Sequence, residues 1–281
     1  MKFLRVGKKG KEIVAAIDKQ GRIRNLSKYI SDLNPDTINF SNLEKIENLK
    51  LEDIEEINSV ERIGSCVSRP GDFLAIGLNY HSHIKETKSN TPKEPILFNK
   101  STGSLSGPND PIHLPAEARK LDYEIEVGMV IGKKGKYIKE KHADEYIFGY
   151  CIVNDISERS WQKDRGGQWI KGKSIAGNCG PLLVTKNEIK DINNINLYLD
   201  VNGKRRQTGN TNKMIFNFNY LISYISQFMT LYPGTIITTG TPDGVVLGMK
   251  NPKFLKVGDK LNLKIDTLGE QNQIIVEEKI I

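Results

Sequence analysis

The segment L-D-Y-E-I-E-V-G-M-V-I-G-K, residues 121–133, decides the fold of this chain. Acidic and apolar residues alternate along it. The acidic residues share one parity: Asp122, Glu124 and Glu126. The apolar residues share the other: Tyr123, Ile125, Val127 and Met129. A period of two predicts a β-strand with one apolar face and one carboxylate face. Taken alone, this is typical of a solvated edge strand, but carboxylates spaced roughly 6.5–7 Å apart along one face can also hold a cation.

The composition is that of an ordinary folded protein. The 281 residues are 38% hydrophobic and 27% charged, which fits one large domain, or a large and a small one. No apolar run reaches the length of a signal peptide core or a membrane span, so we expect a cytoplasmic protein without a membrane partner. The three cysteines are scattered, as reduced thiols are. The net charge of +7 comes from lysines mixed with acids, which argues against nucleic-acid binding and suits a small anionic substrate.

Residues 1–67 are predicted to form a small N-terminal domain, and residues 68–281 the main one. In the first, Phe3–Val6 and Glu12–Ile17 are predicted to pair as strands. Apolar residues at roughly helical spacing predict a helix over residues 41–58. We find no candidate chemistry in this part, so its expected role is packing.

The main domain is rich in predicted strands and poor in helices. Short apolar or β-branched runs predict strands at residues 73–76, 95–98, 148–153, 196–201, 235–239, 261–265 and 274–276. Asn202-Gly203 predicts a hairpin turn, and the clearest amphipathic helix runs from Asn217 to Leu231. We therefore expect an α+β, β-rich fold.

A candidate catalytic pair follows the strand at 73–76. His83 and Glu86 are three residues apart, so on a helix they share a face and the carboxylate can orient the imidazole. Such a pair is a general base able to activate water. The alternative is a surface loop with polar residues.

A further acid, Asp155, ends the strand at 148–153. This is a frequent place for a metal ligand or a catalytic acid, but Asp155 could equally cap the segment 156–162. If a helix begins at Asp155, then Arg159 and Gln162 project from the same side.

Residues 167–174, G-Q-W-I-K-G-K-S, match the phosphate-binding loop pattern. That loop requires a hydrophobic strand before it and a helix after it. Here a polar segment precedes the match, two glycines and a proline follow within residues 177–181, and Trp169 is bulky for a phosphate cradle. We therefore reject a nucleotide-binding P-loop protein and keep Lys173 as a positive group close to Asp155.

Together, these motifs resemble the fumarylacetoacetate hydrolase (FAH) family over nearly all of residues 68–281. The matching strings are G-L-N-Y-x-x-H-x-x-E (77–86), P-x-L-F-x-K (95–100), D-Y-E-x-E (122–126), G-Y-x-x-x-N-D-x-S-x-R-x-x-Q (149–162), N-T-x-x-M-I-F (210–216) and L-x-P-G-T-I-I-x-T-G-T-P-x-G-V (231–245). Within the family, E-R-x-x-Q-x-x-R-G-G-Q-W-x-K-G-K-S (158–174) is similar to bacterial 2,4-diketo-3-deoxy-L-fuconate hydrolases, which are also named ureidoglycolate lyases.

The resemblance implies an FAH-type mixed β-sandwich roll with a small N-terminal domain, assembled as a homodimer or a higher homo-oligomer. It also implies a divalent cation, Mg²⁺ or else Mn²⁺ or Ca²⁺, held by Glu124, Glu126 and Asp155, with Asp122 in a supporting place. The residue chemistry agrees, because all-oxygen ligands suit these ions better than zinc.

The activity implied is hydrolysis of a carbon–carbon bond in a 2,4-dioxo acid to pyruvate and a second acid. In the expected mechanism, the substrate's 1-carboxylate and 2-keto oxygen chelate the cation. His83, oriented by Glu86, deprotonates a water that attacks the 4-carbonyl, and Lys173 helps stabilise the pyruvate enolate. The predicted substrate-binding residues are Tyr80, Lys100, Arg159, Gln162, Gly240 and Thr241. The alternatives are a ureidoglycolate lyase, an oxaloacetate decarboxylase, a 2-hydroxyhepta-2,4-diene-1,7-dioate isomerase and a non-catalytic relative.

One segment departs from the family pattern. Residues 174–181, S-I-A-G-N-C-G-P, are fewer than in the family and lack the acid that follows the lysine there. The sequence therefore leaves the shape of the pocket beside Lys173 open. Cys179 has no histidine near it in sequence, so we expect a packed or exposed thiol and not a nucleophile.

Overall fold

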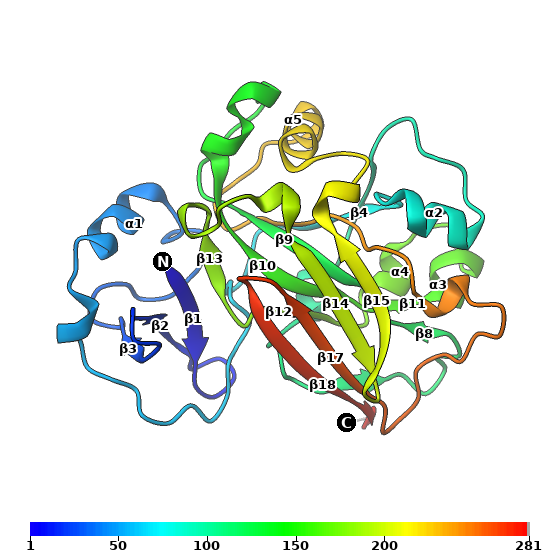
Figure 1. Ribbon diagram of the computed structural model, residues 1–281, viewed down its shortest axis with the longest axis horizontal. Helices are drawn as coiled ribbons and strands as arrows, with labels where there is room; N and C mark the ends of the chain where they lie inside the picture. The colour runs from blue at the N-terminus through cyan, green and yellow to red at the C-terminus, as the bar shows by residue number, and fades with distance from the viewer. Residues whose placement is uncertain (280–281) are drawn as a thin grey trace.

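The computed structural model describes residues 1–279, which form a strand-rich α+β fold, as predicted (Figure 1). An eleven-stranded sheet follows the order β3-β2-β1-β13-β10-β9-β16-β4-β5, with β12 paired to β10 and β6 paired to β12. A five-stranded sheet has the order β15-β14-β17-β18-β7, and β8 pairs with β11.

The strands of the large sheet are β1 (Lys2–Val6), β2 (Ile13–Ile17), β3 (Ile23–Asn25), β4 (Phe73–Gly77), β5 (Ile96–Asn99), β6 (Leu105–Ser106), β9 (Ile125–Ile131), β10 (Ile147–Asp155), β12 (Gly177–Cys179), β13 (Leu183–Thr185) and β16 (Ile236–Thr238). The other strands are β7 (Ile112–Leu114), β8 (Leu121–Asp122), β11 (Ser157–Glu158), β14 (Asn196–Val201), β15 (Lys204–Asn210), β17 (Lys260–Ile265) and β18 (Gly269–Glu277). The α-helices are α1 (Phe40–Glu47), α2 (His81–Thr87), α3 (Arg159–Asp164), α4 (Ile170–Lys173) and α5 (Phe218–Phe228).

The carboxylate segment lies at the centre of the large sheet and not at its edge. β9 pairs with β10 on one side and with β16 on the other, and every residue from 121 to 132 is buried. The reading as a solvated edge strand is therefore wrong. The segment is also interrupted between β8 and β9. There the Asp122 carboxylate accepts from the backbone N–H of Tyr123 (2.9 Å), and the Gln207 side chain accepts from that of Ile125 (3.1 Å).

The two faces of β9 meet different parts of the core. Ile125, Val127 and Met129 belong to the main core, together with residues of the five-stranded sheet and of α5. Val130, on the opposite parity, belongs to a second core cluster that includes Phe3 and other N-terminal residues. The alternation in the sequence thus corresponds to two packed faces, and the acids lie inside the protein.

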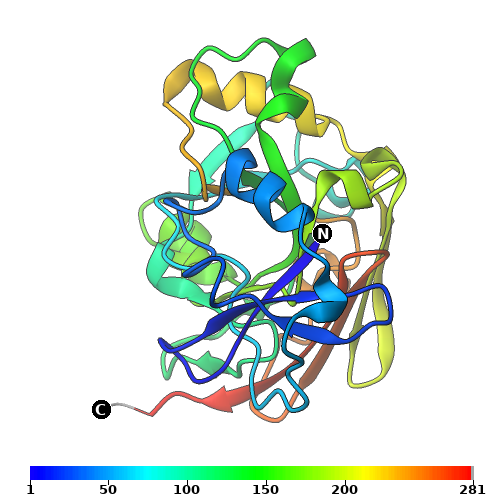
Figure 2. The same cartoon turned by 90° about the vertical axis from the view of Figure 1, so that its left-hand side faces the viewer.

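The N-terminal strands pair as predicted and also extend the large sheet. β1 pairs antiparallel with β2, and its other edge pairs with β13. Figures 1 and 2 show these strands on the side of the molecule away from α2 and α3. The division after residue 67 stays a prediction.

The helix predicted over residues 41–58 is much shorter than expected. α1 ends at Glu47, and the predicted helix is wrong beyond that residue. The later apolar residues serve β-type contacts, since the N–H of Ile57 donates to the carbonyl of Ile23 at 2.8 Å. Apolar spacing alone did not distinguish these two uses.

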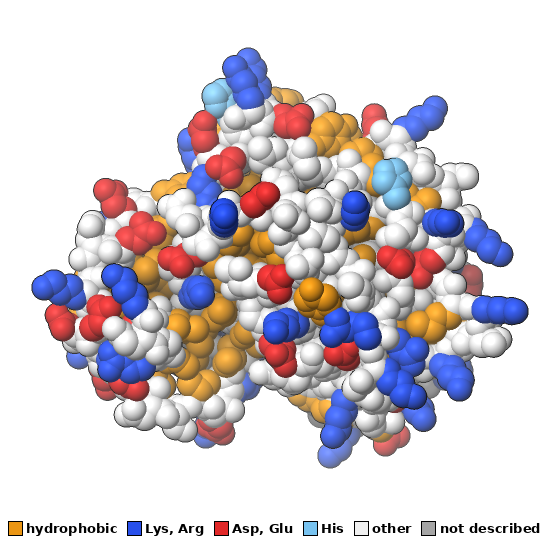
Figure 3. Space-filling model, in the orientation of Figure 1, with side chains coloured by type: hydrophobic (Ala, Val, Ile, Leu, Met, Phe, Trp, Pro, Cys, Tyr) orange, Lys and Arg blue, Asp and Glu red, His pale blue; other side chains and the backbone are white. Residues whose placement is uncertain are grey.

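Among residues 1–279, no helix is both long enough and apolar enough to cross a membrane. Figure 3 shows Lys and Arg side chains mixed with Asp and Glu over much of this face, and Lys and Arg predominate towards its lower right.

Candidate active site

Three buried carboxylates converge where β9 and β10 meet. Glu126 lies opposite Val153 of β10, and Asp155 ends that strand two residues later. The N–H of Asp155 donates to the carbonyl of Glu124 at 2.9 Å, which brings the third acid alongside. One carboxylate oxygen each of Glu124, Glu126 and Asp155 lies within 4.8 Å of the other two. The structure therefore brings together the three predicted metal ligands.

Two buried lysines lie against these carboxylates. The ammonium of Lys173, at the end of α4, donates to Asp155 Oδ2 at 2.9 Å and to Glu124. The ammonium of Lys100 donates to Asp155 Oδ1 at 2.6 Å and to the carbonyl of Lys173. Lys100 therefore supports both the acid and the other lysine.

Arg159, the first residue of α3, binds two of the acids. Its Nη2 donates to Glu124 Oε1 at 2.6 Å and its Nε donates to Asp122 Oδ2 at 2.9 Å. Asp122 also accepts from the backbone N–H of Val246 (2.9 Å) and Leu247 (3.1 Å). Asp122 thus holds Arg159 and the segment at Val246 and Leu247 in place. It is not one of the three carboxylates that converge.

The electrostatics of the group differ from one acid to the next. Burial alone would raise the pKa of Glu124, but Arg159 and Lys173 outweigh it and hold that pKa below its usual range. For Glu126, burial together with the charges of Asp155 and Glu124 raises the pKa well above its usual range. A cation bound beside Glu126 would favour its carboxylate form.

The residues present fit a hard divalent cation. The candidate ligands are all carboxylate oxygens, which is the chemistry that Mg²⁺, Mn²⁺ and Ca²⁺ prefer. The buried charged residues here are four acids and three cations: Asp122, Glu124, Glu126, Asp155, Lys100, Arg159 and Lys173. If all four acids are ionised, these seven side chains carry one net negative charge. A divalent cation together with one carboxylate of a substrate would bring that charge to zero.

His83 and Glu86 form the predicted pair, and α2 supplies the helix that it needs. His83 Nδ1 lies 2.8 Å from Glu86 Oε1. The second oxygen of Glu86 accepts from the backbone N–H of Gly244 at 2.9 Å, so the carboxylate is held on both sides. Since this contact favours a proton on Nδ1, the other ring nitrogen is left to accept one.

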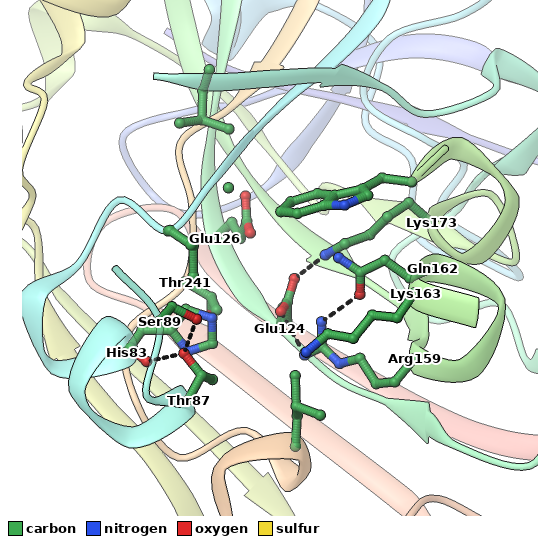
Figure 4. Close-up of a pocket in the computed structure, with 15 residues that line it drawn as sticks. His83, Thr87, Ser89, Glu124, Glu126, Arg159, Gln162, Lys163, Lys173 and Thr241 are labelled. Carbon is green, nitrogen blue, oxygen red and sulfur yellow. Dashed lines mark hydrogen bonds and ion pairs between the residues drawn. The ribbon is translucent and has the colours of Figure 1, made fainter. Parts of the chain in front are cut away.

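A cavity of about 130 Å³ lies beside these groups. His83 and Thr241 border it on one side of Glu124 and Glu126, while residues of α3 and α4 border it on the other (Figure 4). The predicted site residues that line it are His83, Glu124, Glu126, Arg159, Gln162, Lys173 and Thr241. The proposed base thus lies across the cavity from the cationic residues.

The remaining predicted residues lie around this cavity. The N–H of Gly240 donates to Glu126 Oε2 at 2.9 Å, and the ammonium of Lys100 is occupied by Asp155. Tyr80 lines a neighbouring cavity. The substrate contacts predicted for Tyr80, Lys100 and Gly240 stay predictions.

Trp169 is a wall of the cavity to which the sequence analysis gave no role at the site. Its ring packs edge-on against Phe98, with centroids 5.1 Å apart. A Cβ at Gly77 would come within 2.5 Å of the same ring, so glycine is needed there. The signal was the G-G-Q-W string, which entered the sequence analysis in the rejected phosphate loop and in the family resemblance without a role for Trp169. Lys163 and Leu247 line the cavity as well and were also missed.

The structure agrees with the rejection of the P-loop reading. α3 precedes residues 167–174 where a strand would be required, and α4 has only four residues. The sequence analysis considered a helix that begins at Asp155, but α3 begins at Arg159. Its N-terminal cap is Glu158, whose side chain accepts from the N–H of Trp161 at 2.6 Å.

The segment 174–181 does not line the cavity. It packs against residues of the site instead. Gly177 pairs with Asp155 in the sheet and lies against the side chains of Phe73 and Lys100. A Cβ at Gly177 would lie 2.6 Å from the ring of Phe73. The departure from the family pattern therefore falls next to Lys100 rather than on the pocket wall.

A model of the family described as fumarylacetoacetate (FAA) hydrolase, C-terminal, matches residues 72–276. The chain belongs to the fumarylacetoacetate hydrolase family. It is 46% identical over 276 residues to a relative from Burkholderia ambifaria that is provisionally named a hydrolase, and the match covers 97% of this chain and 98% of the relative.

Solved structures of FAH-type enzymes share the whole fold. Fumarylacetoacetate hydrolase from Exiguobacterium antarcticum superposes with a TM-score of 0.85 at 30% identity, over 99% of this chain and 100% of the other. Maleylpyruvate hydrolase from Sphingobium sp. SYK-6, in complex with manganese(II) and pyruvate, gives 0.82 at 25%, over 99% and 100%. 2-Hydroxyhepta-2,4-diene-1,7-dioate isomerase from Mycobacterium marinum gives 0.74 at 26%, over 100% of both chains. Membership of the FAH family makes this chain an enzyme of the hydrolase, isomerase or lyase type.

Proposed function

We propose that this FAH-family enzyme is a divalent-cation-dependent hydrolase that cleaves an acylpyruvate, a 2,4-dioxo acid, into pyruvate and a second carboxylic acid. The observation that carries the proposal is that His83, which is paired with Glu86, lines the same cavity as Glu124 and Glu126. Asp155 converges with these two glutamates beside the cavity. A base that can activate water therefore lies opposite a place for the anionic end of a substrate. The manganese and pyruvate in the Sphingobium maleylpyruvate hydrolase support this choice of ion and product.

Glu124, Glu126 and Asp155 would hold the cation, with Mg²⁺ as the first candidate and Mn²⁺ or Ca²⁺ as others. When bound, it supplies Lewis-acid stabilisation of negative charge on the substrate's oxygens. Lys173 and Lys100 hold Asp155 from one side, while Arg159 holds Glu124 from another. These contacts fix the carboxylates before any ligand arrives.

In the proposed reaction, the free ring nitrogen of His83 takes a proton from water while Glu86 holds the other nitrogen. The water oxygen bonds to C4 of the substrate, and the C3–C4 bond then breaks with its electron pair passing to the pyruvate part as an enolate. Lys173 and Arg159 are the nearby cations that stabilise that charge. A proton returned to C3 completes pyruvate, and C4 leaves as the second acid. The sugar-derived substrate 2,4-diketo-3-deoxy-L-fuconate is the first candidate.

A panel of substrates tests the proposal. The enzyme is incubated with Mg²⁺, Mn²⁺ or Ca²⁺ and with small acylpyruvates, 2,4-diketo-3-deoxy-L-fuconate, oxaloacetate, ureidoglycolate and the heptadienedioate. We expect pyruvate and a second acid from the acylpyruvates only, and only with added cation. Glyoxylate from ureidoglycolate, or carbon dioxide from oxaloacetate, would identify a lyase or a decarboxylase instead.

The second candidate is an isomerase, favoured by the shared fold of the Mycobacterium marinum enzyme. A His83–Glu86 pair can move a proton along a dienoate without adding water. Conversion of 2-hydroxyhepta-2,4-diene-1,7-dioate into a product of the same mass would identify the enzyme as an isomerase.

We also propose that the protein acts in the cytoplasm as a homodimer or a higher homo-oligomer, as its resemblance to FAH enzymes implies. Light scattering of the purified protein tests this assembly. A mass corresponding to one chain would contradict it.

A further inference from the structure

The three cysteines of the chain, which are far apart in sequence, meet inside the protein. Cys179 Sγ lies 3.4 Å from Cys66 Sγ and 3.5 Å from Cys151 Sγ, and all three side chains are fully buried. The sulfur atoms all lie within 4.8 Å of one another. The proposed acylpyruvate chemistry uses none of them.

Three different parts of the fold bring the thiols together. Cys66 lies in the irregular segment that leads from the N-terminal strands to β4, Cys151 is on β10, and Cys179 ends β12. Cys179 pairs with Val153, so it lies diagonally across the strand pair from Cys151. Two of the sulfurs therefore lie on paired strands, and the third lies on a buried segment without regular secondary structure.

We propose that Cys66, Cys151 and Cys179 form a buried binding site for a soft, thiophilic ion with three sulfur ligands, and that trivalent arsenic fits it best. Thiolate sulfur is the ligand that soft ions select. With bonds to sulfur of about 2.3 Å, the length found for zinc and thiolate, a pyramidal ion holds its three sulfurs on the order of 3.5 Å apart. The separations of 3.4 and 3.5 Å from Cys179 Sγ match this arrangement, and the Sγ atoms of Cys66 and Cys151 lie within 4.8 Å of each other.

The net charge of the occupied site also favours trivalent arsenic. The cysteines belong to an apolar cluster that includes Phe3 and Leu183, where a net charge is costly. Arg5 donates to the carbonyl of Ser65, next to Cys66, at 3.1 Å, but its guanidinium is already paired with Asp32 at 2.5 Å. Three thiolates with a trivalent ion are neutral, whereas a divalent ion leaves one negative charge. Zinc also requires a fourth ligand, and the group of converging ligands consists of the three cysteines.

The binding step is balanced without any oxidant. Arsenite, As(OH)₃, exchanges its three hydroxyl groups for three sulfurs, and each thiol proton leaves with one hydroxyl as water. Arsenic stays trivalent and no disulfide forms. Ser65 and Val67, which flank Cys66, line a cavity of about 520 Å³ that gives the ion a route towards this cysteine.

The test uses the reduced, folded full-length protein with arsenite as the probe and with Zn²⁺ and Cd²⁺ in parallel. We expect one arsenic per chain by native mass spectrometry and three sulfur neighbours by X-ray absorption at the arsenic edge. In Cys66→Ala, Cys151→Ala and Cys179→Ala, each confirmed as folded by circular dichroism, the affinity for arsenite should fall by roughly 100-fold or more, because one link of the chelate is lost.

Three results would overturn the proposal. One is an arsenic centre in the wild-type protein with fewer than three sulfur neighbours, a measurement that does not depend on any variant. Another is equal arsenite affinity in the wild type and in folded Cys179→Ala. The third is Zn²⁺ or Cd²⁺ binding to the wild-type thiols more tightly than arsenite does.

Discussion

His83 Nδ1 lies 2.8 Å from Glu86 Oε1, one helical turn away on α2. The same contact recurs at the surface of this chain, where His142 Nδ1 lies 2.8 Å from Glu145 Oε1. The difference between the two pairs is their environment: His83 lines the cavity, whereas His142 and Glu145 are exposed. The surface pair is therefore a matched control for the one at the site.

We predict that His83→Asn lowers kcat for acylpyruvate hydrolysis by roughly 100- to 10,000-fold, the usual contribution of a general base. His142→Asn should leave kcat unchanged. The measurement is steady-state pyruvate release at saturating substrate and cation. Equal kcat values for the two variants would remove His83 from the mechanism.

Gly248 provides a test of Glu86 in which neither His83 nor Glu86 is substituted. A Cβ at Gly248 would lie 2.7 Å from the Glu86 carboxylate, which is held by His83 and by the N–H of Gly244. We predict that Gly248→Ala displaces Glu86 and lowers kcat by roughly 100-fold, as misplaced catalytic groups do. Gly71→Ala, where a Cβ meets nothing within 4 Å, is the control and should retain wild-type kcat. Unchanged kcat in Gly248→Ala would mean that the position of Glu86 does not matter.

Glu124→Gln and Glu126→Gln should each weaken Mn²⁺ binding by more than about 100-fold. Substituting a residue that only hydrogen-bonds to a metal ligand costs up to about 100-fold in affinity, and losing a ligand itself should cost more. Electron paramagnetic resonance of free Mn²⁺ measures the affinity directly, independently of turnover. The control is Asp144→Asn, since Asp144 is an exposed acid paired with Lys186 at 2.7 Å. Wild-type Mn²⁺ affinity in both glutamine variants would rule out these two ligands.

Lys173→Met removes a buried charge that faces Glu124 and Asp155. Without metal, we predict a loss of roughly 3–5 kcal/mol in the free energy of unfolding, because two buried carboxylates each lose one of their two cationic partners. Lys171→Met changes an exposed lysine nearby and should cost less than about 0.5 kcal/mol. Added Mn²⁺ should raise the Tm of Lys173→Met by more than it raises that of the wild type, since the cation replaces the missing charge. Equal Mn²⁺-induced shifts of Tm would contradict this account.

The parts of the site that depend on local spacing could be predicted from the sequence. Helical spacing predicts that His83 and Glu86 share a face, and strand spacing predicts that Glu124 and Glu126 do. Asp155 marks the end of a buried strand. In each case the residues that matter are neighbours in the chain, or mark the end of an element, so a single segment contained the information. The roles of the three acids as metal ligands were implied by the resemblance to the FAH family and not by spacing alone.

The parts that depend on contacts between distant segments could not be predicted. Lys100 meets Asp155 across 55 positions of sequence, and Cys66 meets Cys179 across 113. At the start of β9, the N–H of Ile125 donates to the side chain of Gln207, whose own strand lies far along the chain. Such contacts follow from the order of strands in the sheets, which the periodicity of any one strand does not determine.

The measurement that tests the central claim most directly is acylpyruvate turnover in ¹⁸O-labelled water with Mn²⁺, with mass analysis of both products. The proposed mechanism predicts stoichiometric pyruvate and a second acid that carries one ¹⁸O at the carboxylate formed from C4. It also predicts no products once the cation is removed by a chelator. Turnover without pyruvate, or a second acid without the label, would contradict water attack at that carbon.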